Sequence, residues 1–144
     1  MPTDKRVAYV TGGSRGIGEG IVAALAAEGH HVVAVARNKE KLDAVVKAAA
    51  DKGQSVEAVS VDIADGAALT ASIEQAIEKH GRLDILVNNA GITRDGLFMR
   101  MDDADFDDVI NTNLKSAFVA CRAAARTMSR AKWGRIINIS SVSG

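Results

Sequence analysis

The stretch Thr11-Gly12-Gly13-Ser14-Arg15-Gly16-Ile17-Gly18 decides the fold of this chain through what lies on either side of it. The apolar run 6–11 precedes it, and apolar residues at helical spacing (Ile17, Ile21, Ala24 and Leu25) follow it. The first pattern is typical of a buried strand, and the second of a helix with one apolar stripe. We therefore predict a strand, a glycine-rich turn and a helix in direct succession.

The same unit of strand and helix recurs along the chain. Further buried strands are predicted at 32–36, 56–61, 83–87 and 136–139, with helical patterns between them. Strands that alternate with helices predict an α/β fold, a doubly wound parallel sheet with helices on both faces. The helical stripes are Leu42, Val45, Val46 and Ala49, then Leu69, Ile73, Ala76 and Ile77, and the glycines expected to end three helices are Gly29, Gly53 and Gly81.

The composition is that of an ordinary globular domain. Of 144 residues, 18 are Lys or Arg and 18 are Asp or Glu, and 47% are apolar. This excludes a disordered chain and gives no electrostatic reason to expect a nucleic-acid or membrane partner. The first apolar run is too short for a signal sequence or a membrane span. A single cysteine, Cys121, favours a reducing cytosol, so we expect a cytoplasmic protein.

The glycines of the first turn suit a bound phosphate. Gly12 permits a sharp turn, Gly16 lets the backbone approach a pyrophosphate, and Gly18 lets the helix pack closely on the strand. The helix N-terminus offers N–H groups and partial positive charge to the anion. The alternative is that these glycines only form a turn.

The residues after the second predicted strand indicate which dinucleotide is bound. Ala36-Arg37-Asn38 contains no carboxylate to accept a hydrogen bond from the ribose of NAD. A cation at Arg37, with Arg15 as a second candidate, suits the 2′-phosphate of NADP, so we expect NADPH as the cofactor. The alternative is that both are solvated surface arginines.

Polar residues also follow the third and fourth predicted strands. Asp62 is placed to accept a hydrogen bond from the adenine amino group, or else to cap the next helix, a role for which Asp65 competes. Asn88 and Asn89 are placed to bond neighbouring strands at the edge of the crevice, or else to form a simple turn.

Three motifs in order resemble the short-chain dehydrogenase/reductase family over the whole chain: the glycine turn at 11–18, Asn-Asn-Ala-Gly at 88–91, and Gly-Arg-Ile-Ile-Asn-Ile-Ser-Ser at 134–141. The resemblance implies a Rossmann-like fold and an NADPH-dependent reductase. Within the family, the segments 91–95 and 99–101 are similar to members that reduce 3-oxoacyl groups on acyl carrier protein in fatty acid biosynthesis. Members that reduce acetoacetyl-CoA share much of the pattern. A family member that acts on a steroid, sugar or polyol and a non-catalytic NADP-binding fragment are further alternatives.

The resemblance also implies roles for single residues. Asn113 corresponds to the active-site Asn that helps hold a water, and Ser141 to the Ser that hydrogen-bonds the substrate carbonyl. Read without the family, Asn113 is a polar residue on a mostly apolar helix, and Ser141 is a loop serine. The implied dinucleotide contacts are Gly12, Gly13, Ser14, Arg15, Gly16, Ile17 and Gly18 in the turn, Arg37 for the 2′-phosphate, Asp62 and Ile63 at the adenine, and Asn89, Ala90 and Gly91 near the nicotinamide ribose.

The sequence departs from the family at one point. The family's Tyr-x-x-x-Lys pair is absent, and the only tyrosine, Tyr9, falls in the first predicted strand. We therefore expect residues 1–144 to be the dinucleotide-binding part of one Rossmann-fold domain that continues beyond Gly144, and to be inactive alone. The predicted strand 136–139 would then lie at an exposed edge of an incomplete sheet.

A long helix is predicted from Asp102 to about Arg130. Its acidic first turn lacks the glycine and terminal Glu of a calcium loop, so no metal site is expected, and His30, His31 and His80 are expected at the surface. An apolar stripe, Phe106 to Phe118, is expected to face the sheet. A second, Val119 to Met128, is expected to meet another subunit in a dimer or tetramer. The basic residues near its end are a candidate docking patch for acyl carrier protein, or else only favour the helix dipole: Arg122, Arg126, Arg130, Lys132 and Arg135.

Overall fold

The computed structural model describes residues 5–89 and 100–140. Within them a parallel five-stranded sheet has the order β3-β2-β1-β4-β5. The predicted doubly wound α/β fold is confirmed. The strands are β1 (Val7–Thr11), β2 (His31–Ala36), β3 (Val56–Ser60), β4 (Ile85–Asn88) and β5 (Arg135–Asn138), and the helices are α1 (Gly16–Ala27), α2 (Lys39–Asp51), α3 (Gly66–His80), α4 (Asp103–Val109), the π-helix η2 (Ile110–Lys115) and α5 (Ser116–Ala131).

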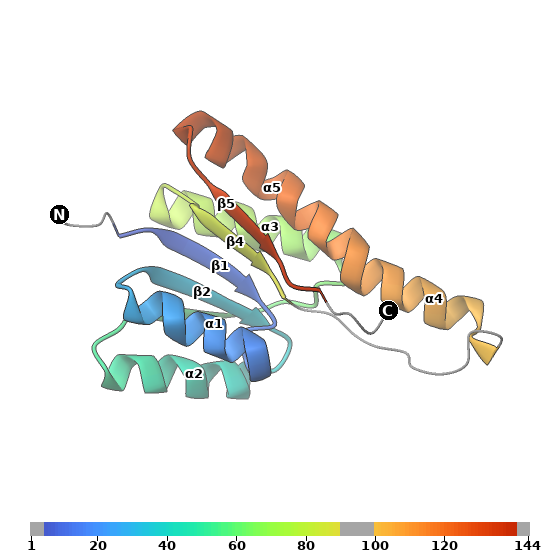
Figure 1. Ribbon diagram of the computed structural model, residues 1–144, viewed down its shortest axis with the longest axis horizontal. Coiled ribbons are helices and arrows are strands. Elements are labelled where there is room, and N and C mark those ends of the chain that lie inside the picture. The colour runs from blue at the N-terminus through green and yellow to red at the C-terminus, as the bar shows by residue number, and fades with distance from the viewer. Residues whose placement is uncertain (1–4, 90–99, 141–144) are drawn as a thin grey trace.

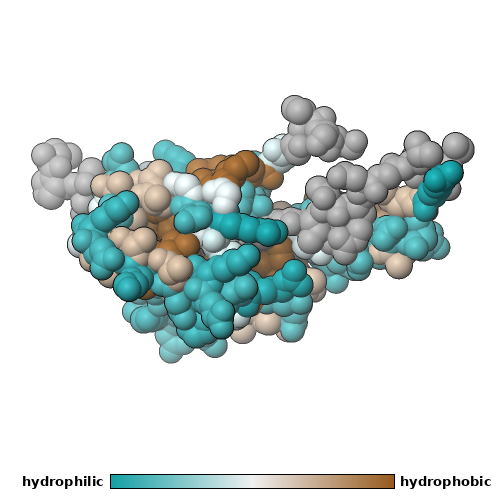
Figure 2. Space-filling view, turned by 90° about the horizontal axis from the view of Figure 1, so that it is seen from below, coloured by the Kyte–Doolittle hydropathy of each residue, from teal (hydrophilic) through white to brown (hydrophobic). Residues whose placement is uncertain are grey.

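Helices cover both faces of the sheet (Figure 1). Alternate side chains of each strand enter opposite cores, as the pleat requires. Tyr9 and Leu86 pack in the core beneath α3 and α5. Val10 and Val32 pack in the core beneath α1 and α2. The surface seen from the α2 side is largely hydrophilic, which fits helices that bury one stripe and expose the rest (Figure 2).

The buried face of α1 differs from the predicted stripe. The residues it buries are Gly18, Val22 and Ala26, whereas Ile17 is 67% exposed. Ile21 and Leu25 pack only at the margin of this core. The reason is that α1 approaches the end of β1 closely at Gly18. A helix so close to the sheet has room only for small residues at that contact. The stripes predicted for α2 and α3 are confirmed by the burial of Leu42, Val45, Ala49, Leu69, Ile73 and Ala76.

The long C-terminal helix is turned the opposite way from the prediction. Phe106, Leu114 and Phe118 are 56%, 64% and 58% exposed, so the stripe expected to face the sheet faces outward. The buried face of α5 is made mostly of small residues, and α5 packs against α3 through it. Small residues allow this close packing, while the bulky ones remain outside. The buried residues are Ser116, Val119, Ala120, Ala124 and Met128.

The ends of the elements follow local rules. Gly29, Gly53 and Gly81 adopt positive φ after α1, α2 and α3, as predicted. Strand β5 lies at the edge of the sheet with all its residues exposed, which confirms the expected exposed edge. No helix among the described residues is long and apolar enough to cross a membrane.

Candidate functional site

The glycine turn between β1 and α1 lies at the carboxyl end of the sheet. Gly12 and Gly16 have φ values of 66° and 57°, the left-handed region that glycine adopts without strain. The Gly13 N–H donates to the Val35 carbonyl (3.1 Å), which fixes the turn against β2. A Cβ built on Gly16 would meet nothing within 4 Å, so its backbone is open to a ligand.

The first turn of α1 is suited to an anion. Its N-cap residue, Arg15, makes no side-chain capping bond. In contrast, the side chains of Asn38, Asp65 and Asp102 accept from backbone N–H groups at the starts of α2, α3 and α4. Backbone N–H groups at the start of α1 are therefore left for a ligand, and the helix dipole favours a negative one.

Asn89 holds the glycine turn from β4. Its side-chain Nδ2 donates to the Gly12 carbonyl (3.3 Å), and its backbone N–H donates to Thr11 Oγ1 (3.0 Å). The Thr11 hydroxyl in turn donates to the Val87 carbonyl (3.4 Å). Asn89 therefore bonds a neighbouring strand end, one of the two readings its position allowed. The role of Thr11 was not predicted, although a hydroxyl directly before the turn was the available signal.

A second side-chain amide contact lies at the same carboxyl end of the sheet, between β4 and β5. Asn88 Nδ2 donates to Asn138 Oδ1 (2.9 Å), and the two residues are register partners on β4 and β5. Asn88 Nδ2 also lies 3.6 Å from Cys121 Sγ on α5. Nothing in the sequence singled out Asn138, because its importance depends on which residue it faces across the sheet.

The residues expected to contact the 2′-phosphate and the adenine lie on the loops after β1, β2 and β3. Arg15 and Arg37 are both exposed, beside the turn and after β2 respectively. Asp62 is exposed, and its Oδ1 accepts from the Ala64 N–H (3.0 Å). The structure assigns the α3 cap to Asp65, so the capping alternative for Asp62 is wrong. The remaining contacts differ in exposure: Ser14 is half-buried, Ile17 exposed and Ile63 buried.

Asn113 lies in the π-helix η2, between α4 and α5. This segment lies beyond the strand ends that carry the glycine turn (Figure 1). A π turn inside a helix changes the direction of its side chains and is frequent at functional sites. The predicted site residues Ser141, Ala90 and Gly91 lie outside the described residues.

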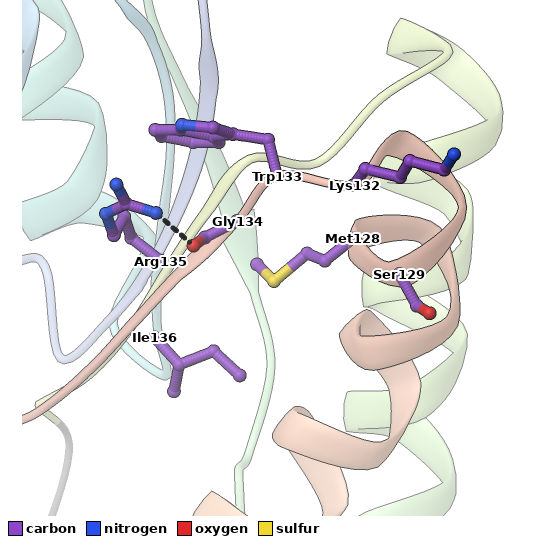
Figure 3. A pocket seen from close by; sticks show the side chains of 7 residues that line it. All are labelled: Met128, Ser129, Lys132, Trp133, Gly134, Arg135 and Ile136. Atoms are coloured by element: carbon purple, nitrogen blue, oxygen red, sulfur yellow. Dashed lines mark hydrogen bonds between the residues drawn. The ribbon is translucent and has the colours of Figure 1, made fainter.

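An open pocket of about 500 Å³ lies at the other end of the sheet, where α5 leads into β5 (Figure 3). Gly134 permits this connection, because a Cβ there would lie 2.6 Å from the Met128 side chain. The indole of Trp133 contacts two cations, with the guanidinium carbons of Arg6 and Arg135 at 3.9 and 4.6 Å from its ring centroid. The pocket is remote from the glycine turn and is not a candidate cofactor site.

The comparisons with known proteins agree with this geometry. The model of the short chain dehydrogenase family matches residues 6–144. The chain belongs to the short-chain dehydrogenase family. It is 49% identical over 138 residues to 3-oxoacyl-[acyl-carrier-protein] reductase FabG of Staphylococcus aureus, covering 95% of this chain and 56% of that protein. It is 42% identical over 133 residues to the protein of the same name from Chlamydia pneumoniae, covering 92% and 54%.

A solved structure of a short-chain oxidoreductase also matches this chain. A metagenomic short-chain oxidoreductase in complex with NADP superposes with a TM-score of 0.92 at 42% identity, covering 96% of this chain and 63% of that one. The chain therefore spans about half the length of the curated relatives it matches. The family and these relatives support an oxidoreductase that uses a nicotinamide cofactor.

The only tyrosine within residues 1–144, Tyr9, is unsuited to proton transfer. Tyr9 is fully buried in β1, and its hydroxyl lies 2.8 Å from Ser72 Oγ. Burial raises the pKa of Tyr9 to about 12, against a smaller lowering by the bond to Ser72. Its role is to join the central strand to α3.

Proposed function

We propose that this chain is the cofactor-binding part of an NADPH-dependent reductase that converts a 3-oxoacyl thioester, carried on acyl carrier protein, into the 3-hydroxyacyl thioester. The observation that carries the proposal is the glycine turn beside the N-terminus of α1, a helix whose first N–H groups receive no side-chain cap. In addition, the residue after β2 is Arg37 rather than a carboxylate. The similarity to 3-oxoacyl-[acyl-carrier-protein] reductases supports the substrate class.

The turn fits a pyrophosphate. A Cβ on Gly18 would lie 1.8 Å from the Gly12 carbonyl oxygen, so helix and turn meet at a distance that only glycine allows. This contact holds the first turn of α1, which begins at the open backbone of Gly16, against the glycine turn. NADPH, when bound, supplies the hydride. The α1 N-terminus would bind its phosphates, and Arg37 with Arg15 would bind the 2′-phosphate.

The remaining residues would position the cofactor and the substrate. Asp62 would accept from the adenine amino group beside Ile63, and the segment from Asn89 to Gly91 would border the nicotinamide ribose. Asn113 would hold a water within η2. The Ser141 hydroxyl would hydrogen-bond the substrate carbonyl, where negative charge grows as hydride adds to carbon.

Arg37 provides the test of cofactor choice. A charge-assisted hydrogen bond contributes about 1.5–3 kcal/mol, so Arg37→Ala should weaken NADPH binding roughly 10- to 150-fold. Binding of NADH, which lacks the 2′-phosphate, should be unchanged. Fluorescence titration of the full-length protein with both cofactors measures this. Equal losses for NADPH and NADH would refute the assignment of Arg37, and NADPH binding without turnover would favour the non-catalytic alternative.

The carrier protein is proposed as a partner because of a basic stripe on α5. Arg122, Arg126 and Arg130 are four residues apart and all exposed, so they lie along one helix face. Acyl carrier protein is acidic and complements such a face. Arg126→Glu should raise KM for the carrier-protein thioester and leave KM for the CoA thioester nearly unchanged. A preference for acetoacetyl-CoA that is insensitive to this change would identify an acetoacetyl-CoA reductase instead.

Self-association is proposed through the outward face of the helical segment formed by α4, η2 and the start of α5, on the N-terminal side of the basic stripe. Phe106, Leu114 and Phe118 are more than half exposed, although each is large and apolar. Such a face is stabilised when a second copy of the chain covers it. Phe118→Asp should lower the mass measured by light scattering from a dimer or tetramer to a smaller species. An unchanged mass would exclude this face.

A further inference from the structure

Two histidines and a glutamate converge at the amino end of the sheet, opposite to the glycine turn. His31 begins β2, Glu57 lies on β3, and His80 ends α3. His31 Nε2 and His80 Nε2 both contact Glu57 Oε1, at 3.0 and 2.6 Å. One ligand atom from each residue lies within 4.8 Å of the others. The two histidines were expected at the surface as flanks of turns; the structure places them beside turns, with side chains that are only partly exposed.

The cluster is largely shielded from solvent, and its carboxylate is paired with Lys79. The side chains of His31, Glu57 and His80 are only 15%, 24% and 18% exposed. Burial acts to raise the pKa of Glu57, but hydrogen bonds from Lys79 and the two histidines outweigh it and lower this pKa to about 2. The contacts with Lys79 and the two histidines therefore hold the Glu57 carboxylate in place between β2 and α3.

The groups around the cluster support metal ligation. Ser55 Oγ lies 2.5 Å from His31 Nδ1. A serine hydroxyl both donates and accepts, so Ser55 Oγ can accept a hydrogen bond from His31 Nδ1–H while Nε2 becomes a ligand. Lys79 Nζ donates to Glu57 Oε2 at 2.8 Å, which leaves Oε1 for the ion. Outer hydrogen bonds of this kind hold ligands in position at zinc sites.

We propose that His31, Glu57 and His80 form a binding site for a zinc ion. Two imidazoles and one carboxylate are a donor set that zinc prefers, with water in the fourth position. Zinc–ligand bonds of about 2.0–2.2 Å place tetrahedral ligands roughly 3.3 Å apart. The present separations of 2.6 and 3.0 Å from Glu57 Oε1 would each widen by less than an ångström, and all three ligand atoms already lie within 4.8 Å of one another. The ion would join β2, β3 and α3 without touching the cofactor turn.

The test uses the full-length protein without an affinity tag, after treatment with a chelator. Zinc titration by calorimetry should show one equivalent bound per chain, and zinc should raise Tm. Cobalt(II) should give the visible absorption of a tetrahedral site. His80→Gln keeps a polar group beside Glu57 but loses the ligand, so it should weaken zinc binding at least about tenfold.

The control is His30→Asn. His30 Nδ1 accepts from the Arg6 N–H (3.3 Å) and lies outside the cluster, and asparagine keeps an acceptor at that place. This variant should bind zinc like the parent protein. Binding of less than about 0.2 equivalents by the parent protein, or equal affinity in His80→Gln, would overturn the site and leave a hydrogen-bonded network. NADPH affinity, measured in the same samples, reports on the cofactor turn separately.

Discussion

Replacing Gly18 with alanine tests the close approach between α1 and the glycine turn. The new Cβ would lie 1.8 Å from the Gly12 carbonyl oxygen and 2.6 Å from Asn89 Nδ2. The nearer atom belongs to the backbone of a residue at φ 66°, and it also accepts the hydrogen bond from Asn89. Helix and turn would have to separate by more than an ångström, which would disturb the phosphate site.

The magnitude follows from two opposing effects. Overpacking costs about 1–3 kcal/mol, and a backbone obstacle places this site at the upper end. Alanine recovers about 0.8–1 kcal/mol of helix propensity relative to glycine. The expected net loss is about 2 kcal/mol of unfolding free energy, or roughly 4–8 °C in Tm for a domain of 150–250 residues. Gly20→Ala, in the same helix with nothing within 4 Å, should instead gain about 0.5–1 kcal/mol.

Urea unfolding of both full-length variants, followed by circular dichroism, measures the two changes side by side. NADPH titration should show weaker binding for Gly18→Ala and an unchanged affinity for Gly20→Ala. If Gly18→Ala unfolds at the same urea concentration as the parent protein or a higher one, the contact between Gly18 and the turn is not as described, and the pyrophosphate assignment loses its main support.

Three further substitutions test how the sheet is held. Asp84→Asn should lower the free energy of unfolding in urea by about 2 kcal/mol, because Asp84 is 4% exposed and its carboxylate accepts two hydrogen bonds from Arg82, at 2.7 and 3.1 Å. An unchanged free energy of unfolding would mean that this ion pair does not stabilise the fold. Tyr9→Phe should cost about 1 kcal/mol, since it leaves the buried Ser72 hydroxyl without its 2.8 Å partner; a more stable variant would contradict this. Gly81→Ala should cost about 1 kcal/mol through strain at φ 72°, with no steric clash; an unchanged thermal midpoint would exclude that strain.

Features set by neighbours in sequence were predictable. Gly81 ends α3 in the left-handed conformation, as a glycine after an apolar stripe indicates. The strands were located because each is a short apolar run rich in β-branched residues, which suits a strand covered on both faces. Helix phase was predicted less well. On η2 and α5 the hydrophobicity of Leu114 and Phe118 suggested burial, but the space against α3 admits the small side chains of Ala120 and Ala124.

Contacts between distant segments were not predictable. Asn88 and Asn138 meet because β4 and β5 pair in a particular register. His31 and His80 meet because α3 returns along the sheet and ends beside the start of β2. Asn88 was expected to bond a neighbouring strand, but nothing in the local sequence identifies the partner in either pair.

The two proposed sites are joined by strand β3, and this decides how independent they are. Glu57 lies near its start, and Asp62 follows its end. Between them β3 is paired with β2 from Val32↔Val56 to Ala36↔Ser60, so the strand cannot slide without breaking this ladder. An ion at the amino end would therefore resist strand separation but would not move Asp62 toward or away from a dinucleotide. Zinc should raise Tm and leave NADPH affinity unchanged, and a zinc-dependent NADPH affinity would show that β3 shifts as a unit.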